Sequence, residues 1–244
     1  MSTNKVALIT GANKGIGYEI ARQLGQQSIT VLVGARDQAR GAEAADKLRA
    51  EGIDALAVQL DVTDGKTIEA TKKFVEEKFG KLDILVNNAG IIGGYDWGTP
   101  PSDVPLDTVR KVFETNFFGV IAVTQSFLPL LKKSEAGRVV NVSSGLGSLT
   151  KLSDTSYEFS GINFLDYNAS KTALNAITLS FAKEFKNTPL KINAADPGYT
   201  ATDINNNTGT KTVAEGADTP VWLATLPDDG PTGGFFSARE PMPW

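Results

Sequence analysis

Short apolar segments rich in Val, Ile and Leu alternate with amphipathic segments from one end of the chain to the other. The apolar segments do not alternate with polar residues, which is typical of strands covered on both faces. They predict strands at residues 5–10, 29–35, 55–60, 82–87, 138–143 and 191–196, and a last short strand at 234–237. The segments between them predict helices at 15–24, 40–51, 66–79, 106–131, 167–186 and 212–223.

This regular alternation predicts an α/β fold, a doubly wound parallel sheet with helices on both faces. At 244 residues, the chain is expected to form a single domain over residues 1–244. Such sheets bind ligands beyond the carboxyl ends of their strands. Three long loops follow predicted strands, at 91–105, 145–163 and 197–211, and we expect them to shape a substrate site.

The composition excludes several kinds of catalytic site. The chain has no His and no Cys, which removes Ser-His-Asp catalysis, thiolate nucleophiles, disulfides and nearly every zinc site, so no metal is predicted. The net charge is −4, without a block of like charge, so neither nucleic acid nor a membrane surface is an expected partner. We predict no signal peptide and no membrane span, and the lack of cysteine is compatible with the cytoplasmic location that we expect.

The segment TGANKGIG, residues 10–17, follows the first predicted strand and opens the first predicted helix. Its glycines at 11, 15 and 17 do not have the G-x-G-x-x-G spacing, but the same physics applies. Glycine lets the backbone approach a pyrophosphate, and the helix N-terminus offers free N–H groups and a positive dipole end. A plain turn is the alternative, but the position after the first strand of the pattern favours a nucleotide site.

The residues after the second predicted strand indicate which nucleotide binds. Sites for NAD usually carry an acidic residue there to hold the ribose 2′-hydroxyl. Here Arg36 could pair with a 2′-phosphate, and Lys14 adds a second positive charge nearby. NADP(H) is therefore the predicted cofactor. Asp37 leaves NAD open if the loop turns it inward, and both cations could be ordinary surface residues.

Further motifs follow the predicted strands or lie on the predicted helices. They are NNAG at 87–90, TNFFG with Asn116, VVNVSS ending at Ser144, Y-x-x-x-K formed by Tyr167 and Lys171, and the pair Pro197-Gly198. With TGANKGIG, these motifs make the chain resemble the short-chain dehydrogenase/reductases over nearly its whole length. The motifs and the tail DDGPTGGFFSAREPMPW are similar to those of the carbonyl-reductase branch.

The resemblance implies a Rossmann-like sheet, a nicotinamide cofactor, and the reduction of a carbonyl or the reverse oxidation. The catalytic residues that it implies are Asn116, Ser144, Tyr167 and Lys171. With the glycine loop and Arg36, the expected cofactor-binding set is Gly11, Asn13, Lys14, Gly15, Ile16, Gly17, Arg36, Asp61, Val62, Asn88, Ala89, Gly90, Tyr167, Lys171, Pro197, Gly198, Thr200 and Thr202.

The Tyr167–Lys171 pair suits proton transfer in a chain without histidine. A carbonyl oxygen that accepts hydride needs hydrogen-bond donors and then a proton. Lys171 lies one helical turn after Tyr167 and on the same side. A cation about 4 Å away is worth about 4 kcal/mol at an effective dielectric near 20, or roughly three pKa units. We therefore expect the pKa of Tyr167 to fall toward 7.

Two of the catalytic assignments have alternatives. Strand alternation turns only one of Ser143 and Ser144 into the cleft, and the resemblance favours Ser144 as the second donor to the carbonyl oxygen. Asn116 is unusual inside a helix because Asn competes with helical backbone bonds. It could hold a water that links Lys171 to solvent, or it could be a buried structural amide.

The loops suggest the kind of substrate. Tyr95, Trp97 and Tyr199 lie at the carboxyl edge and suit a small or medium apolar aldehyde, ketone or quinone, although Trp97 could merely anchor its own loop. An NADP-linked alcohol dehydrogenase and a non-catalytic NADP(H)-sensing protein are the alternatives. The 23 residues from Ser144 to Tyr167 are more than the family usually has, which leaves the assembly open between monomer and homodimer.

Overall fold

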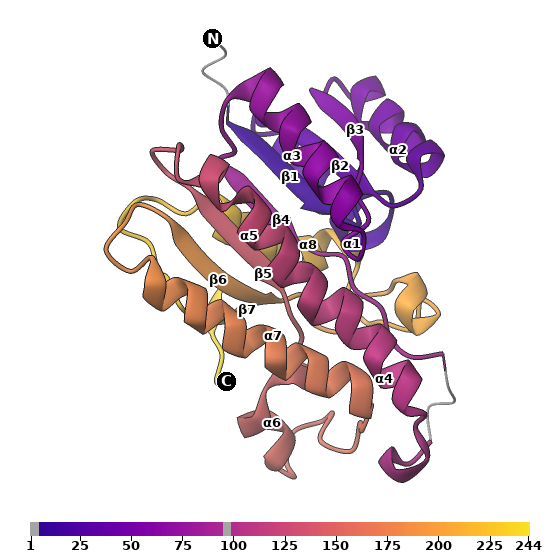
Figure 1. Ribbon diagram of the computed structural model, residues 1–244. Coiled ribbons are helices and arrows are strands. Elements are labelled where there is room, and N and C mark those ends of the chain that lie inside the picture. The colour runs from indigo at the N-terminus through magenta and orange to yellow at the C-terminus, as the bar shows by residue number, and fades with distance from the viewer. Residues whose placement is uncertain (1–4, 95–98) are drawn as a thin grey trace.

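The computed structural model describes residues 5–94 and 99–244. Its described strands form one sheet in the order β3-β2-β1-β4-β5-β6-β7-β8 (Figure 1). The strands are β1 (Val6–Thr10), β2 (Thr30–Ala35), β3 (Ala55–Gln59), β4 (Ile84–Asn87), β5 (Arg138–Val142), β6 (Lys191–Asp196), β7 (Phe235–Ser237) and β8 (Glu240–Pro241). Strands β1 to β7 are parallel and β8 is antiparallel to β7. The chain crosses from one half of the sheet to the other beside β1, which pairs with both β2 and β4.

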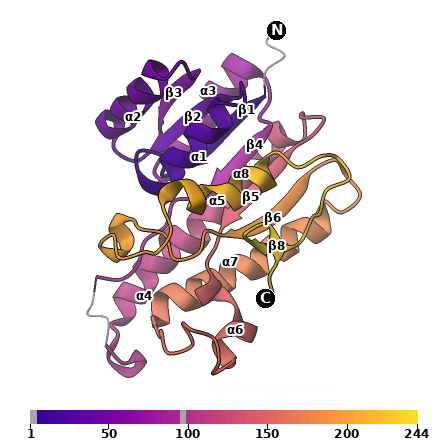
Figure 2. The ribbon, with the colours of Figure 1, turned by 180° about the vertical axis from the view of Figure 1, so that it is seen from behind.

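Helices cover both faces of this sheet. They are α1 (Gly15–Gly25), α2 (Gln38–Ala50), α3 (Gly65–Phe79), α4 (Leu106–Phe113), α5 (Gly119–Leu131), α6 (Leu149–Ser153), α7 (Leu165–Glu184) and α8 (Val213–Ala224). Figure 1 shows α3, α5 and α7 in front of the sheet, and Figure 2 shows α1, α2 and α8 on the opposite face. Helix ends follow the sequence: Asp64 accepts from Lys66 N–H at the start of α3, and Gly80 ends that helix in the left-handed region at φ +74°.

Two apolar cores result from the alternation of side chains along each strand. Ala7 and Ile9 of β1 belong to the core beneath α1, α2 and α8. Their neighbours Val6 and Leu8 belong to the core beneath α3, α5 and α7. Because both faces of the parallel strands are buried, the strands are apolar throughout, which is the pattern that identified them in the sequence.

The sequence predicted this fold class, and each predicted strand and helix that is found as one element ends within two residues of its expected position. One prediction was wrong. The expected helix over 106–131 is two helices, α4 and α5, joined by a wider π-helical turn, η2 (Glu114–Phe118). The short helix α6 and strand β8 were not predicted, because each has fewer residues than a periodic pattern needs.

Candidate active site

Tyr167 and Lys171 lie on the first turns of α7, beside the carboxyl end of β5. The four-residue spacing places both side chains on one face of the helix, and Lys171 Nζ lies 5.6 Å from the centre of the Tyr167 ring. Lys171 is only 4% exposed, and its ammonium group donates a 2.8 Å hydrogen bond to the carbonyl of Val142. A buried cation therefore lies beneath a partly buried phenol.

Ser144 is the serine that faces Tyr167. It follows β5, and its side chain hydrogen-bonds the Tyr167 hydroxyl. Ser143 points the other way and donates a 2.6 Å hydrogen bond to Asn175 Oδ1 in the interior. The alternation expected from the strand separates the two serines, and Ser144 is the one that the structure brings next to the phenol.

The pKa values of this pair differ from the sequence-based expectation. The pKa of Tyr167 is raised to about 12: burial raises it most, the hydrogen bond with Ser144 lowers it, and the charge of Asp196 adds a smaller rise. Burial lowers the pKa of Lys171 to about 8. The expected fall in the pKa of Tyr167 was therefore wrong for the chain without a bound ligand, because loss of water around the phenol dominates.

Asn116 lies in the π-helical turn η2 and is fully buried. Its amide nitrogen donates to the Ile91 carbonyl (2.8 Å) and to Ser170 Oγ (3.0 Å), and its Oδ1 accepts from Ile91 N–H (2.9 Å). The wider turn aims this side chain across to the loop after β4, so both donor hydrogens are used within the protein. These contacts fit the expectation that Asn116 is a buried structural amide. The turn that carries it is nevertheless of a kind that is frequent at functional sites.

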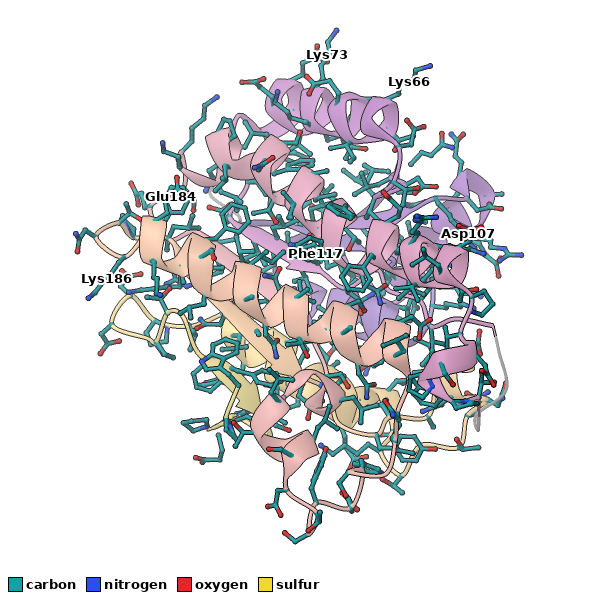
Figure 3. All side chains as sticks on the ribbon, turned by 60° about the horizontal axis from the view of Figure 1, so that its bottom comes forward. Lys66, Lys73, Asp107, Phe117, Glu184 and Lys186 are labelled. Carbon is teal, nitrogen blue, oxygen red and sulfur yellow. The ribbon has the colours of Figure 1, made fainter. Side chains whose placement is uncertain are left out.

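Figure 3 shows this turn among the helices that cover one face of the sheet. Phe117 of η2 lies at the centre of the view beside α7, whereas Lys66 and Lys73 of α3 and Glu184 and Lys186 near the far end of α7 project from the periphery. The Phe117 ring makes edge contacts with the rings of Phe113 and Phe118.

The glycine loop is shaped for close approach to its neighbours. Gly11 has φ +64°, and a Cβ at Gly17 would lie 2.3 Å from Asn88 Nδ2. The Asn88 amide donates to the carbonyls of Thr10 (2.9 Å) and Gly11 (3.2 Å), which fixes the turn. Helix α1 begins at Gly15, and its N-cap residue Lys14 makes no side-chain capping bond. The first N–H groups of α1 are therefore available to an anion.

The charged residues around the loop show which nucleotide fits. Asp37 accepts the Arg40 N–H at the start of α2 (3.0 Å), so it is turned toward its own helix. Lys14 forms an exposed ion pair with Asp203. Arg36 is exposed at the carboxyl end of β2. This arrangement leaves a positive edge beside the glycine loop.

A cavity of about 280 Å³ adjoins this edge. Asn13, Lys14, Arg40 and Lys47 line it together with Glu43 and Ala44. Sequence reasoning missed Arg40, since nothing in the sequence distinguishes it from the other exposed cations of this helix.

The structure places the other residues expected to bind the cofactor at several positions. Asp61 Oδ1 accepts from Thr63 N–H (2.9 Å), and Val62 packs against Gly119. Thr200 is buried, and its hydroxyl bonds carbonyls of its own loop. The residues that the structure brings together around the glycine loop are Gly11, Asn13, Lys14, Gly15, Gly17, Asn88, Ala89 and Thr202. Gly90 lies instead beside Asn116 and Lys171, Ile16 packs on the core, and Pro197 and Gly198 follow β6.

Aromatic side chains join two of the loops near the site. Phe159 packs against Tyr157 (5.6 Å between ring centres) and against Tyr199 (5.7 Å). This contact links the 145–163 loop to the 197–211 loop. Tyr95 and Trp97 lie outside the described residues. The C-terminal tail packs on the fold, with the ring of Trp244 stacked on Phe235 at 5.5 Å.

Two kinds of feature are absent from the described part of the chain. Residues 5–94 and 99–244 contain no group of three or more acidic side chains placed to hold a metal ion. Within the same ranges, no helix has the length and apolar character needed to cross a membrane.

Comparisons with known proteins extend these observations. Residues 5–212 match the family described as short chain dehydrogenase. The chain is 33% identical to a (+)-neomenthol dehydrogenase of Capsicum annuum, over 98% of this chain and 97% of that one. It is 37% identical to carbonyl reductase (NADPH) 1 of Bos taurus, over 100% of this chain and 99% of that one.

The structural comparison agrees with the sequence comparison. The NADPH-bound carbonyl reductase from chicken fatty liver superposes with a TM-score of 0.85 at 28% identity, and 99% of each chain is covered. The alignment with the bovine relative runs over 281 positions, more than the 244 residues of this chain. That relative therefore contains segments that this chain lacks.

Proposed function

Because the chain belongs to the short-chain dehydrogenase family and is an oxidoreductase, we propose that it reduces the carbonyl of a small or medium aldehyde, ketone or quinone with NADPH. Tyr167 is the general acid of this proposal. The observation that carries it is the Tyr167 phenol, hydrogen-bonded to Ser144 and placed above the buried ammonium of Lys171. This arrangement lies at the same sheet edge as the glycine loop, where Rossmann-like sheets bind their ligands.

The residues around the glycine loop fit a phosphorylated dinucleotide. The uncapped N-terminus of α1 and the glycine turn would hold the pyrophosphate. Arg36 and Arg40 would hold the 2′-phosphate, joined by Lys14 in exchange for its ion pair with Asp203, and the use of Asp37 as a helix cap removes the carboxylate that NAD would need. The Asn88 amide is engaged with the loop, which leaves its Oδ1 for the ribose. When bound, the nicotinamide supplies the hydride.

The protein residues manage the charge on the carbonyl oxygen. Tyr167 and Ser144 donate hydrogen bonds to this oxygen as negative charge develops on it. Tyr167 then transfers its proton, and the ammonium of Lys171 stabilises the phenolate that remains. Asn116 holds the Gly90–Ile91 turn beside Lys171, which keeps the ammonium in place.

The raised pKa of Tyr167 fits its role as the proton donor in carbonyl reduction. With its pKa near 12, the phenol is protonated throughout the neutral range. Carbonyl reduction needs this protonated form, whereas alcohol oxidation needs the phenolate. The linked aromatic side chains of Tyr157, Phe159 and Tyr199 support an apolar substrate. The cytoplasmic location and the monomeric or homodimeric state stay predictions.

Replacing the proposed acid tests the catalytic role. We expect Tyr167→Phe to lower kcat for carbonyl reduction by at least about 100-fold, since general acid catalysis contributes this much. The Kd of NADPH, followed by its fluorescence, should stay within about twofold of the wild-type value. Tight NADPH binding by the wild-type protein without turnover of any aldehyde, ketone or quinone would favour a cofactor-sensing protein instead.

The cofactor assignment is tested at the positive edge of the glycine loop. Arg36→Ala and Arg40→Ala should each weaken NADPH by roughly tenfold or more and NADH by less than about twofold, because only NADPH carries the phosphate that they would pair with. Fluorescence titration with both cofactors measures this difference. Equal losses for the two cofactors would contradict the phosphate contact.

A further inference from the structure

Asp196 is a buried carboxylate at the carboxyl end of β6, and the proposed chemistry does not use it. It is 8% exposed. Its Oδ1 accepts hydrogen bonds from the N–H groups of Gly145 (2.9 Å) and Gly198 (3.1 Å). Its Oδ2 accepts from the hydroxyl of Ser237 (2.8 Å). One side chain therefore joins three segments that are far apart in the sequence.

Two of these segments carry proposed site residues. Gly145 directly follows Ser144, which hydrogen-bonds Tyr167. Gly198 begins the loop that leads to Thr202, which faces Gly15 of the glycine loop. The third segment, β7, pairs with β6, and its Ser237 hydroxyl donates to the carboxylate. The hydrogen bonds of Asp196 thus tie the proton-donor side of the site to the cofactor side.

The surroundings leave little freedom for the Gly145 backbone. A Cβ at this position would lie 2.8 Å from the Tyr157 hydroxyl, 3.2 Å from Met242 Cε and 3.6 Å from Asp196 Oδ2. The N–H of Gly145 donates to Asp196. Atoms of the 145–163 loop and of the C-terminal segment fill the space beside the Gly145 α-carbon. The Asp196 bond is therefore the polar part of a tightly packed contact that fixes the residue following Ser144.

We propose that Asp196 is a positioning residue, whose carboxylate holds the Ser144–Gly145 turn at a fixed distance from the 197–202 loop. Errors of about 1 Å in such a distance can slow an enzyme about 100-fold, which is why a residue outside the reacting groups matters. The expected effect on turnover rests on the proposed function. The link between the two loops rests on the hydrogen bonds alone.

The charge of Asp196 is compatible with this role. Charged groups close to Tyr167 include Lys171 from the same helix and Asp196 from β6, while the 145–163 loop contributes Tyr157 with Lys151 over its ring. The carboxylate raises the pKa of Tyr167. Removing its charge would leave the phenol protonated at pH 7, so a neutral residue that keeps the hydrogen bonds should still support carbonyl reduction.

Two variants separate hydrogen bonding from charge. In Asp196→Ala the acceptor is lost, and we expect amide exchange at Gly145 and Gly198, measured by NMR, to accelerate together by roughly tenfold or more. The kcat for the best carbonyl substrate should fall by roughly 10- to 100-fold, with the Kd of NADPH changed by less than about threefold. Asp196→Asn keeps an oxygen acceptor and should recover most of kcat and of the amide protection.

Asp83 provides a matched control at the opposite end of the strands. It is 3% exposed and accepts from Val6 N–H (2.9 Å), Ser134 Oγ (2.6 Å) and Lys81 Nζ (2.8 Å). Asp83→Ala should lower stability without changing exchange at Gly145 or kcat per folded molecule. If Asp196→Ala does not fold, Ser237→Ala removes only the third bond, and exchange at Gly145 should change in the same direction by less.

The outcomes distinguish this inference from the proposed function. Unchanged exchange at Gly145 in Asp196→Ala, or an Asp196→Asn variant as slow as Asp196→Ala, would overturn the positioning role while leaving the reductase proposal intact. Failure of the wild-type protein to reduce any carbonyl would instead overturn the reductase proposal. The exchange measurements do not depend on turnover and would still decide whether Asp196 holds the two loops together.

Discussion

Lys171 shows how a single residue of the site opposes the stability of the fold. Its ammonium group is almost fully buried, and burial lowers its pKa from 10.5 to about 8. A folded-state pKa below the unfolded value means that the charged form destabilises the folded state. This cost is full below about pH 8, shrinks as the pH rises, and vanishes above the unfolded pKa of 10.5.

Lys171→Met should therefore abolish turnover and stabilise the protein. We expect the free energy of unfolding at pH 7 to rise by about 2–3 kcal/mol, the value of the pKa shift less one hydrogen bond. Urea denaturation at pH 7 and pH 10 measures the effect. The gain should shrink strongly at pH 10, and an equal gain at both values would assign it to packing instead of charge.

At this scale the sequence predicted which residues meet but not their energetics. The spacing of Tyr167 and Lys171 and the alternation of Ser143 and Ser144 are local regularities, so a periodic argument can place them. The direction of the Tyr167 pKa shift depends on how much water the whole fold excludes, which no local pattern reports. Arg40 was missed for a similar reason, because only tertiary structure shows which surface cation lines a cavity.

At the scale of elements, the π-helical turn η2 is the feature that the sequence concealed. Residues 106–131 have a continuous helical period, and one wider turn hardly changes it. Asn116 was the only hint, since it disfavours a helix interior. The turn places Asn116 across from Ile91, where a regular helix would rotate the side chain away. The widened turn therefore connects the helical face to the loop after β4.

Asn116→Ala should loosen that loop. It removes three buried hydrogen bonds, and we expect a loss of about 2–4 kcal/mol in the free energy of unfolding together with faster amide exchange at residues 90–94. Asn193→Ala is the matched control, because Asn193 likewise binds a backbone carbonyl, that of Pro231, and a backbone N–H, that of Gly234. Faster exchange at residues 90–94 in both variants would indicate general destabilisation instead.

At the scale of the whole molecule, Arg138 stabilises the end of the sheet opposite the site, where strand β5 begins. The side chain is 2% exposed and donates to the carbonyls of Leu226, Gly137 and Pro189 and to the carboxylate of Asp228. Arg138→Ala should lower the free energy of unfolding by about 3 kcal/mol or more, since it leaves several buried carbonyls unpaired. Urea denaturation measures this loss. The kcat per folded molecule should not change, and a fall in kcat would mean that the two ends of the sheet are coupled.

The position of β1 in the sheet also bears on how the protein refolds. Its two neighbours, β2 and β4, belong to opposite halves of the sheet, and the contact between Val6 and Asp83 spans 77 residues. The glycine loop belongs to one half, and Tyr167 and Lys171 to the other. Long-range pairings of this kind form slowly, after local helices. During refolding, helical circular dichroism should therefore recover well before NADPH binding, and cofactor fluorescence would time the moment at which the two halves join.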